Sequence, residues 1–224
     1  MSGITTRHRS AAGALAALCL AAVVSLSGCA AIGFGGAGSV ELRAFETGAV
    51  LSPGWRTAVF TSDDPNSANI YLSDLSLDAI TTTAPESLDA VAGNILHVRM
   101  FIRPRAGQTP IDFDASNITI RHIVLAPGAM GVYGGGGFLL PSGSPEGRSF
   151  GGRIRRATLR LTEASIAFSD RLGPVELSGR INATRDDDAA QAVARTISGL
   201  LARREARPVD APALAPSGES PTSP

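Results

Sequence analysis

The chain has 224 residues, of which 44% are hydrophobic, and its 20 basic side chains balance 20 acidic ones. A net charge of zero without a basic block gives no electrostatic footprint for nucleic acid. Its two cysteines, Cys19 and Cys29, both lie near the N-terminus, which excludes disulfides and thiolate metal sites from the rest of the chain. That remainder is long enough for one domain with one hydrophobic core.

The first segment has the order of a secretory signal peptide. Residues Arg7 to Arg9 form a short basic region, and an uncharged, mostly apolar run follows from Ala11 to Leu26. This run is shorter than the roughly 20 residues that a transmembrane helix needs. We therefore expect residues 1–28 to be a leader that is removed.

The apolar run ends in Leu26-Ser27-Gly28-Cys29, an aliphatic residue and two small residues before a cysteine. This stretch resembles the lipobox of bacterial lipoproteins. The resemblance covers about the first 30 residues, and it implies that the Cys29 thiol receives a diacylglycerol, that a signal peptidase cuts before Cys29, and that the new N-terminus is usually acylated, for example with palmitate. A thiolate is the soft nucleophile that this reaction needs. The alternative is an ordinary cleaved signal peptide with an incidental cysteine.

The lipobox resemblance also predicts where the protein works. Two or three acyl chains hold a protein firmly at a membrane, so we expect anchoring through the lipid on Cys29. In one well-studied sorting system, the residue after the lipidated cysteine decides the membrane, and Asp at that position retains a lipoprotein in the inner membrane. By that rule, Ala30 would send this protein to the outer membrane. Both a periplasmic and a surface-exposed orientation remain open.

Changes in composition divide the chain after the leader. Residues 29–39 form the lipidated cysteine and a Gly-rich tether, and residues 40–206 form a single β-rich domain. Residues 207–224 are rich in Pro, Ala and Ser and predict a disordered tail. Three tether glycines have the spacing of a dinucleotide-binding turn, but no strand precedes them, so we expect no cofactor.

The domain consists mostly of short runs in which apolar and polar residues alternate. These runs predict strands at Val40–Phe45, Trp55–Ser62, Asn69–Ser73, Ile95–Arg103, Asn117–Leu125, Met130–Tyr133, Gly152–Leu161, Ser165–Ser169 and Val175–Thr184. Residues 74–90 predict a loop with at most one helical turn. Because no βαβ alternation is present, we expect a mainly β fold, either an antiparallel β-sandwich or a partly closed barrel.

One amphipathic helix is predicted at the end of the domain, over residues 187–204. Asp186 to Asp188 supply an N-cap and negative charge at the positive end of the helix dipole. Apolar residues then recur at helical spacing, at Ala189, Val193, Ile197, Leu200 and Leu201. We expect this face to pack on the β core.

Two histidines on predicted strands, His97 and His122, are the first candidates for chemistry. If their strands pair, the two rings could meet, and Asp112 and Asp114 could complete a metal site. No ligand-spacing motif is present, so partly buried, hydrogen-bonded histidines and ordinary loop acids are the favoured interpretation.

A run of four glycines lies between two aromatic residues. Its backbone N–H groups could cradle an anion, although no Lys-Ser/Thr follows as in a P-loop. The favoured interpretation is a glycine-rich hairpin or bulge. We expect the stretch to be a contact loop, because another surface can approach glycines closely. This loop would consist of Tyr133, Gly134, Gly135, Gly136, Gly137 and Phe138.

These features predict a membrane-anchored lipoprotein of the cell envelope that is a structural or binding module and no enzyme. Its expected partner is the membrane, with an envelope protein or an apolar ligand as a further partner. The alternatives are a metal-dependent hydrolase that uses His97, His122 and Asp112, and a carrier of an apolar ligand.

Overall fold

A computed structural model describes residues 37–82, 87–104 and 116–205 of the chain. The predicted leader, Cys29, most of the tether, the Asp112/Asp114 pair and the C-terminal tail lie outside these residues.

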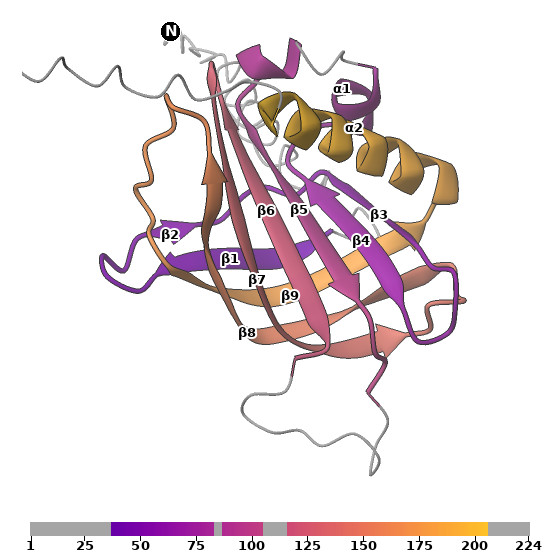
Figure 1. Ribbon diagram of the computed structural model, residues 1–224. Coiled ribbons are helices and arrows are strands. Elements are labelled where there is room, and N and C mark those ends of the chain that lie inside the picture. Colours follow the sequence, from indigo (N-terminus) through magenta and orange to yellow (C-terminus); the bar gives the residue numbers. More distant parts are fainter. Residues whose placement is uncertain (1–36, 83–86, 105–115, 206–224) are drawn as a thin grey trace, which may run out of the picture. The chain divides into compact units, whose positions relative to one another are not determined.

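Nine strands and a long C-terminal helix make up the described part, which confirms the mainly β prediction (Figure 1). The strands are β1 (Gly38–Ala44), β2 (Val50–Leu51), β3 (Thr57–Thr61), β4 (Ala68–Ser73), β5 (Gly93–Met100), β6 (Ile118–Ala126), β7 (Ala129–Gly143), β8 (Ser149–Ala164) and β9 (Val175–Arg185). The helices are α1 (Leu77–Thr81), the 3₁₀ turn η1 (Ser87–Ala90) and α2 (Asp187–Glu205).

All nine strands belong to one sheet that curls back on itself. Their order is β2-β1-β9-β3-β4-β5-β6-β7-β8, and β8 also pairs with β9. Strand β9 therefore joins the two ends of the β3-to-β8 series and closes a ring (Figure 1). The seam between β3 and β9 is short and parallel, with Val59 opposite Thr184 and Phe60 opposite Arg185, whereas every other pairing is antiparallel. Of the two predicted architectures, the partly closed barrel is the one formed.

The inner face of the ring is filled by a cluster of buried side chains, which we call the inner cluster. Strand β5 illustrates how it forms: Leu96, Val98 and Met100 alternate with polar residues and are fully buried. On the two strands that flank β9, the aromatic rings of Phe60 and Phe150 lie 5.7 Å apart. Each such side chain contributes roughly 1.5–3 kcal/mol by leaving water, so this interior is the main source of stability.

Helix α2 packs on the outer face of the same sheet, as predicted. Its residues Ala190, Val193 and Ile197 join buried side chains of β3–β7, α1 and η1 in a second cluster, the outer cluster. The N-terminus of α2 is capped by Asp186, whose Oδ1 accepts a hydrogen bond of 2.9 Å from the backbone N–H of Ala189. In the part of the chain that the structure describes, no helix is long and apolar enough to cross a membrane.

Two local predictions about short segments, Ser165–Ser169 and 74–90, are wrong. Ser165–Ser169 is a turn and no strand, in which the N–H of Phe168 bonds to the carbonyl of Ser165 at 2.9 Å. The segment 74–90 contains both α1 and η1 in place of a single helical turn.

The glycine run is part of a strand rather than a loop or hairpin, and the register between β7 and β8 shifts at both ends of it. The run continues β7, which extends to Gly143. The chain turns earlier, at Gly128, whose φ of 72° suits a tight turn between β6 and β7. The residues that lie in the strand instead of a loop are Tyr133, Gly134, Gly135, Gly136, Gly137 and Phe138.

Candidate functional site

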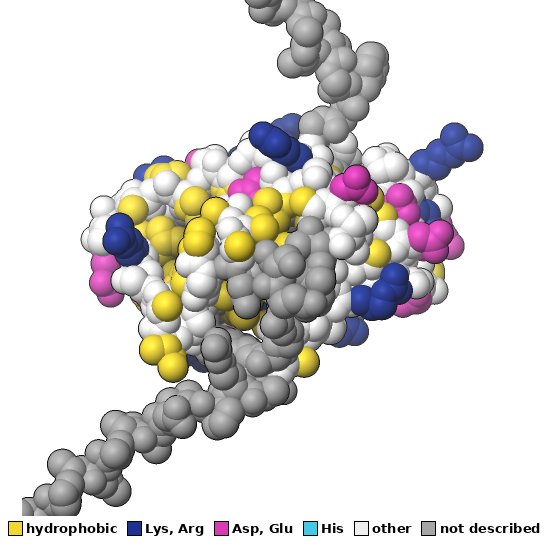
Figure 2. Space-filling model, turned by 90° about the horizontal axis from the view of Figure 1, so that it is seen from above, with side chains coloured by type: hydrophobic (Ala, Val, Ile, Leu, Met, Phe, Trp, Pro, Cys, Tyr) yellow, Lys and Arg dark blue, Asp and Glu magenta, His cyan; other side chains and the backbone are white. Residues whose placement is uncertain are grey.

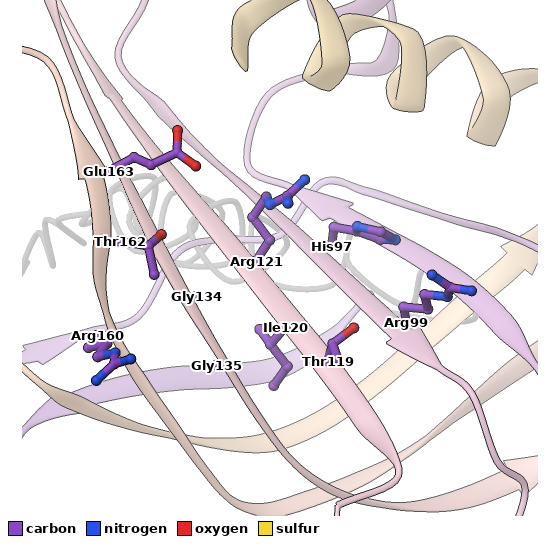
Figure 3. A pocket seen from close by; sticks show the side chains of 10 residues that line it. All are labelled: His97, Arg99, Thr119, Ile120, Arg121, Gly134, Gly135, Arg160, Thr162 and Glu163. Carbon is purple, nitrogen blue, oxygen red and sulfur yellow. The ribbon is translucent and has the colours of Figure 1, made fainter. Parts of the chain in front are cut away.

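A groove of about 650 Å³ lies on the outer face of β5–β8, and we call it the arginine groove. It is lined by His97, Arg99, Thr119, Ile120, Arg121, Gly134, Gly135, Arg160, Thr162 and Glu163. In Figure 3, Arg160 stands on one side of the two glycines, and Arg121 and Arg99 stand on the other.

Strand register places these residues together although they are far apart in the sequence. His97 lies opposite Arg121, Arg121 opposite Gly134, and Gly134 opposite Arg160, so one row crosses four strands. Side chains of one row point to the same face of a sheet. Arg121 and Arg160 therefore stand on either side of Gly134, which has no side chain. The groove exists because glycine separates them.

The backbone of β7 forms the floor of the groove, and it lies very close to β8. A Cβ atom added at Gly135 would be 1.9 Å from the carbonyl oxygen of Thr158. At Gly134 the nearest atom would be the Cγ2 of Thr162, at 2.9 Å. Glycine is therefore required at Gly135 by the approach of the neighbouring strand.

The electrostatic character of the arginine groove is positive. Among the described residues the ion pairs within 4.0 Å are Arg43–Glu41 and Arg185–Asp187, so Arg99, Arg121 and Arg160 take part in none of them. Glu163 contributes a carboxylate at one end of the groove (Figure 3). Guanidinium groups that lie near one another repel, and an anion between them relieves that repulsion.

His97 responds to this positive charge. Burial, and then the charges of Arg121 and Arg99, lower its pKa to about 4. Its ring stacks on Tyr71 with centroids 4.6 Å apart and 9° between the planes, and its Nε2 lies 3.1 Å from Oδ1 of Asn69. The imidazole is therefore neutral and fixed in position at the edge of the groove.

The structure does not bring His97 and His122 together. Their strands do pair, but His97 shares a row with Arg121 on the outer face, while His122 shares a row with Leu96 and is fully buried in the ring. Within the described residues, no three His, Cys, Asp or Glu side chains are grouped to hold a metal ion. Asp112 and Asp114 lie outside those residues.

His122 instead belongs to a partly buried chain of polar side chains. Asp74 accepts hydrogen bonds of 2.7 Å from the backbone N–H and the side-chain amide of Asn94, which leaves Oδ1 of Asn94 to accept from Nε2 of His122 at 3.1 Å. Nδ1 of His122 then carries the lone pair, and it has no hydrogen-bond partner among the described residues. Burial lowers the pKa of His122 to about 4, although the Asp74 carboxylate acts in the opposite direction.

The two aromatic residues of the expected contact loop are strand residues. Tyr133 is buried, and its hydroxyl donates a hydrogen bond of 2.5 Å to Asp170. Burial, followed by the Asp170 carboxylate, raises the pKa of Tyr133. Phe138 sits where the register between β7 and β8 shifts. The buried Tyr133 therefore supports the fold and offers no contact surface.

The four glycines between these aromatic residues divide into two pairs. Gly134 and Gly135 line the arginine groove, whereas Gly136 and Gly137 do not. A Cβ atom at Gly136 would be 2.9 Å from the carbonyl oxygen of Ile118, and one at Gly137 would be 2.6 Å from the Cβ of a β8 alanine. Close packing against the neighbouring strands accounts for the glycines at Gly136 and Gly137.

Sequence reasoning missed the three arginines of the groove. Each occupies a polar position of a predicted alternating strand, which indicates only that it faces outward. The pairing of β6 with β7 and of β7 with β8 is what gathers them, and that register is not readable from a single strand. The glycine run was the one available signal.

Figure 2 shows another face, seen from above, on which hydrophobic side chains gather. Trp55, Phe168 and Leu172 are partly buried against the inner cluster. The ring interior holds packed side chains.

No family model matches the chain, and no curated protein or solved structure matches it either.

Proposed function

We propose that this protein is a lipid-anchored binding module of the cell envelope, which binds an anionic ligand in the arginine groove and performs no chemistry on it. The observation that carries the binding role is the row of Arg121, Gly134 and Arg160, with Arg99 and the neutral His97 beside it. Planar guanidinium groups match the oxygens of a phosphate or carboxylate group and bind it through paired hydrogen bonds.

The anchor is supported by Leu26-Ser27-Gly28-Cys29 at the end of the apolar leader. Lipid on Cys29 would hold the domain at the membrane, and the small residue Ala30 favours the outer membrane. A binding role fits the described residues better than the hydrolase alternative, because His97 and His122 face opposite sides of the sheet.

Cys29→Ser tests the anchor. Without the thiol no diacylglycerol can be attached, so we expect unlipidated precursor or soluble protein in place of membrane-bound mature protein. Intact-mass measurement and membrane fractionation of both chains check this. Mutant protein of mature size that is still bound to the membrane would overturn the anchor.

Arg121→Gln tests the groove, with inorganic phosphate as the probe. A hydrogen bond to a charged group contributes about 1.5–3 kcal/mol, so we expect phosphate to bind roughly tenfold or more weakly to the variant in calorimetric titration of the full protein. Arg195→Gln removes an exposed charge from α2 and is the matched control, with unchanged binding.

A second readout comes from His97. Bound phosphate offsets the charges of Arg99 and Arg121, so the pKa of His97 should rise from about 4 toward its ordinary value, which NMR of the imidazole protons measures. Equal weakening by the control variant, or phosphate binding with no change at His97, would contradict a site in the arginine groove.

A further inference from the structure

A second groove lies on the outer face of β1, β8 and β9, where the chain enters the domain. We call it the exit groove; its volume is about 530 Å³. It is lined by Ser39, Glu41, Ser52, Arg153, Ile154, Arg155, Ser178, Gly179 and Arg180.

Three arginines dominate the charge of the exit groove. Ser39 lies opposite Arg180, and Arg180 lies opposite Arg153, so two like charges form a direct cross-strand pair. Such a pair is destabilising unless a counter-charge is near. Glu41 also lines the groove, but its carboxylate forms an ion pair of 3.7 Å with Arg43, and neither ion pair of the described residues includes one of the three arginines.

The exit groove lies beside the start of the first strand. The carbonyl of Ala37 accepts a hydrogen bond of 3.1 Å from the N–H of Asn182, and Gly38 pairs with Ile181, so the backbone is fixed to β9 from this point. Eight residue steps separate Ala37 from Cys29, and even a fully extended chain of that length spans at most about 29 Å. A lipid on Cys29 would therefore hold the start of β1 within about that distance of the membrane surface.

We propose that the exit groove docks on the anionic lipid headgroups of the membrane that holds Cys29. The inference rests on the proposed lipid anchor. An acyl anchor together with a basic patch is a two-signal mode of membrane attachment, and the arginines carry the charge that anionic headgroups attract. Docking would fix the orientation of the domain on the membrane. The arginine groove, which lies on β5–β8, would then remain accessible to a soluble ligand.

The test uses the lipid-bearing protein, purified in detergent and returned to vesicles. One set of vesicles contains only phosphatidylcholine, and the other contains equal parts of phosphatidylcholine and phosphatidylglycerol. Phenylglyoxal modifies accessible arginines, and peptide mass spectrometry measures the rate at each one. Arg195 on α2 is the internal control, because it is also exposed.

We expect Arg153, Arg155 and Arg180 to react at least about fivefold more slowly on the anionic vesicles, which corresponds to the attraction of a single arginine near such a surface. The protection should disappear in about 1 M salt, where charges are screened beyond roughly 3 Å. In the double variant Arg153→Gln/Arg180→Gln, most of the protection of Arg155 should be lost, whereas Arg195→Gln should leave it unchanged.

Equal reaction rates on the two kinds of vesicle would overturn the docking, as would protection of Arg99, Arg121 and Arg160 in place of the exit groove. Intact mass separates the two levels of failure. A lipid-bearing protein without protection defeats only the docking, whereas a protein with no lipid on Cys29 defeats the anchor and the docking together.

Discussion

His122 is a histidine that the fold keeps neutral. It lies inside the ring with the rings of Trp55 and Tyr133 about it, at centroid distances of 6.5 and 6.2 Å, and one nitrogen has no partner among the described residues. A cation there would lose its hydration without a carboxylate in hydrogen-bond contact. The residue therefore makes the stability of the domain depend on pH.

The sign follows from the two states of the chain. The unfolded chain binds a proton at His122 near pH 6.5, whereas the folded chain does so only near pH 4, so the stabilisation is complete above pH 6.5 and is lost as the pH falls toward 4. The difference corresponds to roughly 3 kcal/mol, and His97 acts in the same direction. We expect His122→Phe to lose about half as much stability between pH 7 and pH 4 as the natural chain, measured by urea unfolding. An unchanged pH dependence in the variant would contradict a neutral, buried His122.

At the scale of secondary-structure elements, strand β7 is the least conventional. Its four glycines, Gly134 to Gly137, have no side chains to pack on either face of the sheet. Their backbone nevertheless pairs with β6 on one side and with β8 on the other. Isolated, such a segment has little tendency to form a strand. Its neighbours impose the conformation, and the absent side chains leave room for the arginine groove.

Alanine substitutions should separate the two roles of these glycines. Gly135→Ala places a Cβ against the Thr158 carbonyl, so we expect a loss of about 3 kcal/mol or more in unfolding free energy. Gly134→Ala meets only the Thr162 side chain, and a loss of about 1 kcal/mol is expected. Gly54→Ala, with nothing within 4 Å, is the matched control and should be near neutral in the same urea titrations. Similar losses at Gly134 and Gly135 would show that strand approach is not the cause.

At the scale of the whole domain, alternation within a strand was enough to predict which side chains enter the ring. Leu96, Val98 and Met100 in β5 face the inner cluster as expected, and the apolar stripe of α2 lies on the sheet. The closure through β9 was not predictable, because its parallel seam with β3 involves only two residue pairs, far apart in the sequence. The candidate site depends on such non-local pairings, so its arginines could be assigned a face but not neighbours.

The order of the strands also determines how this sheet meets other chains. Its terminal strand, β2, has two residues, and the carbonyl of Val40 on the neighbouring β1 is occupied by the indole N–H of Trp55 at 3.3 Å. An incoming peptide needs a long row of free backbone groups to add itself as a further strand. So short a terminal strand thus offers an incoming chain little free backbone for edge-to-edge self-association.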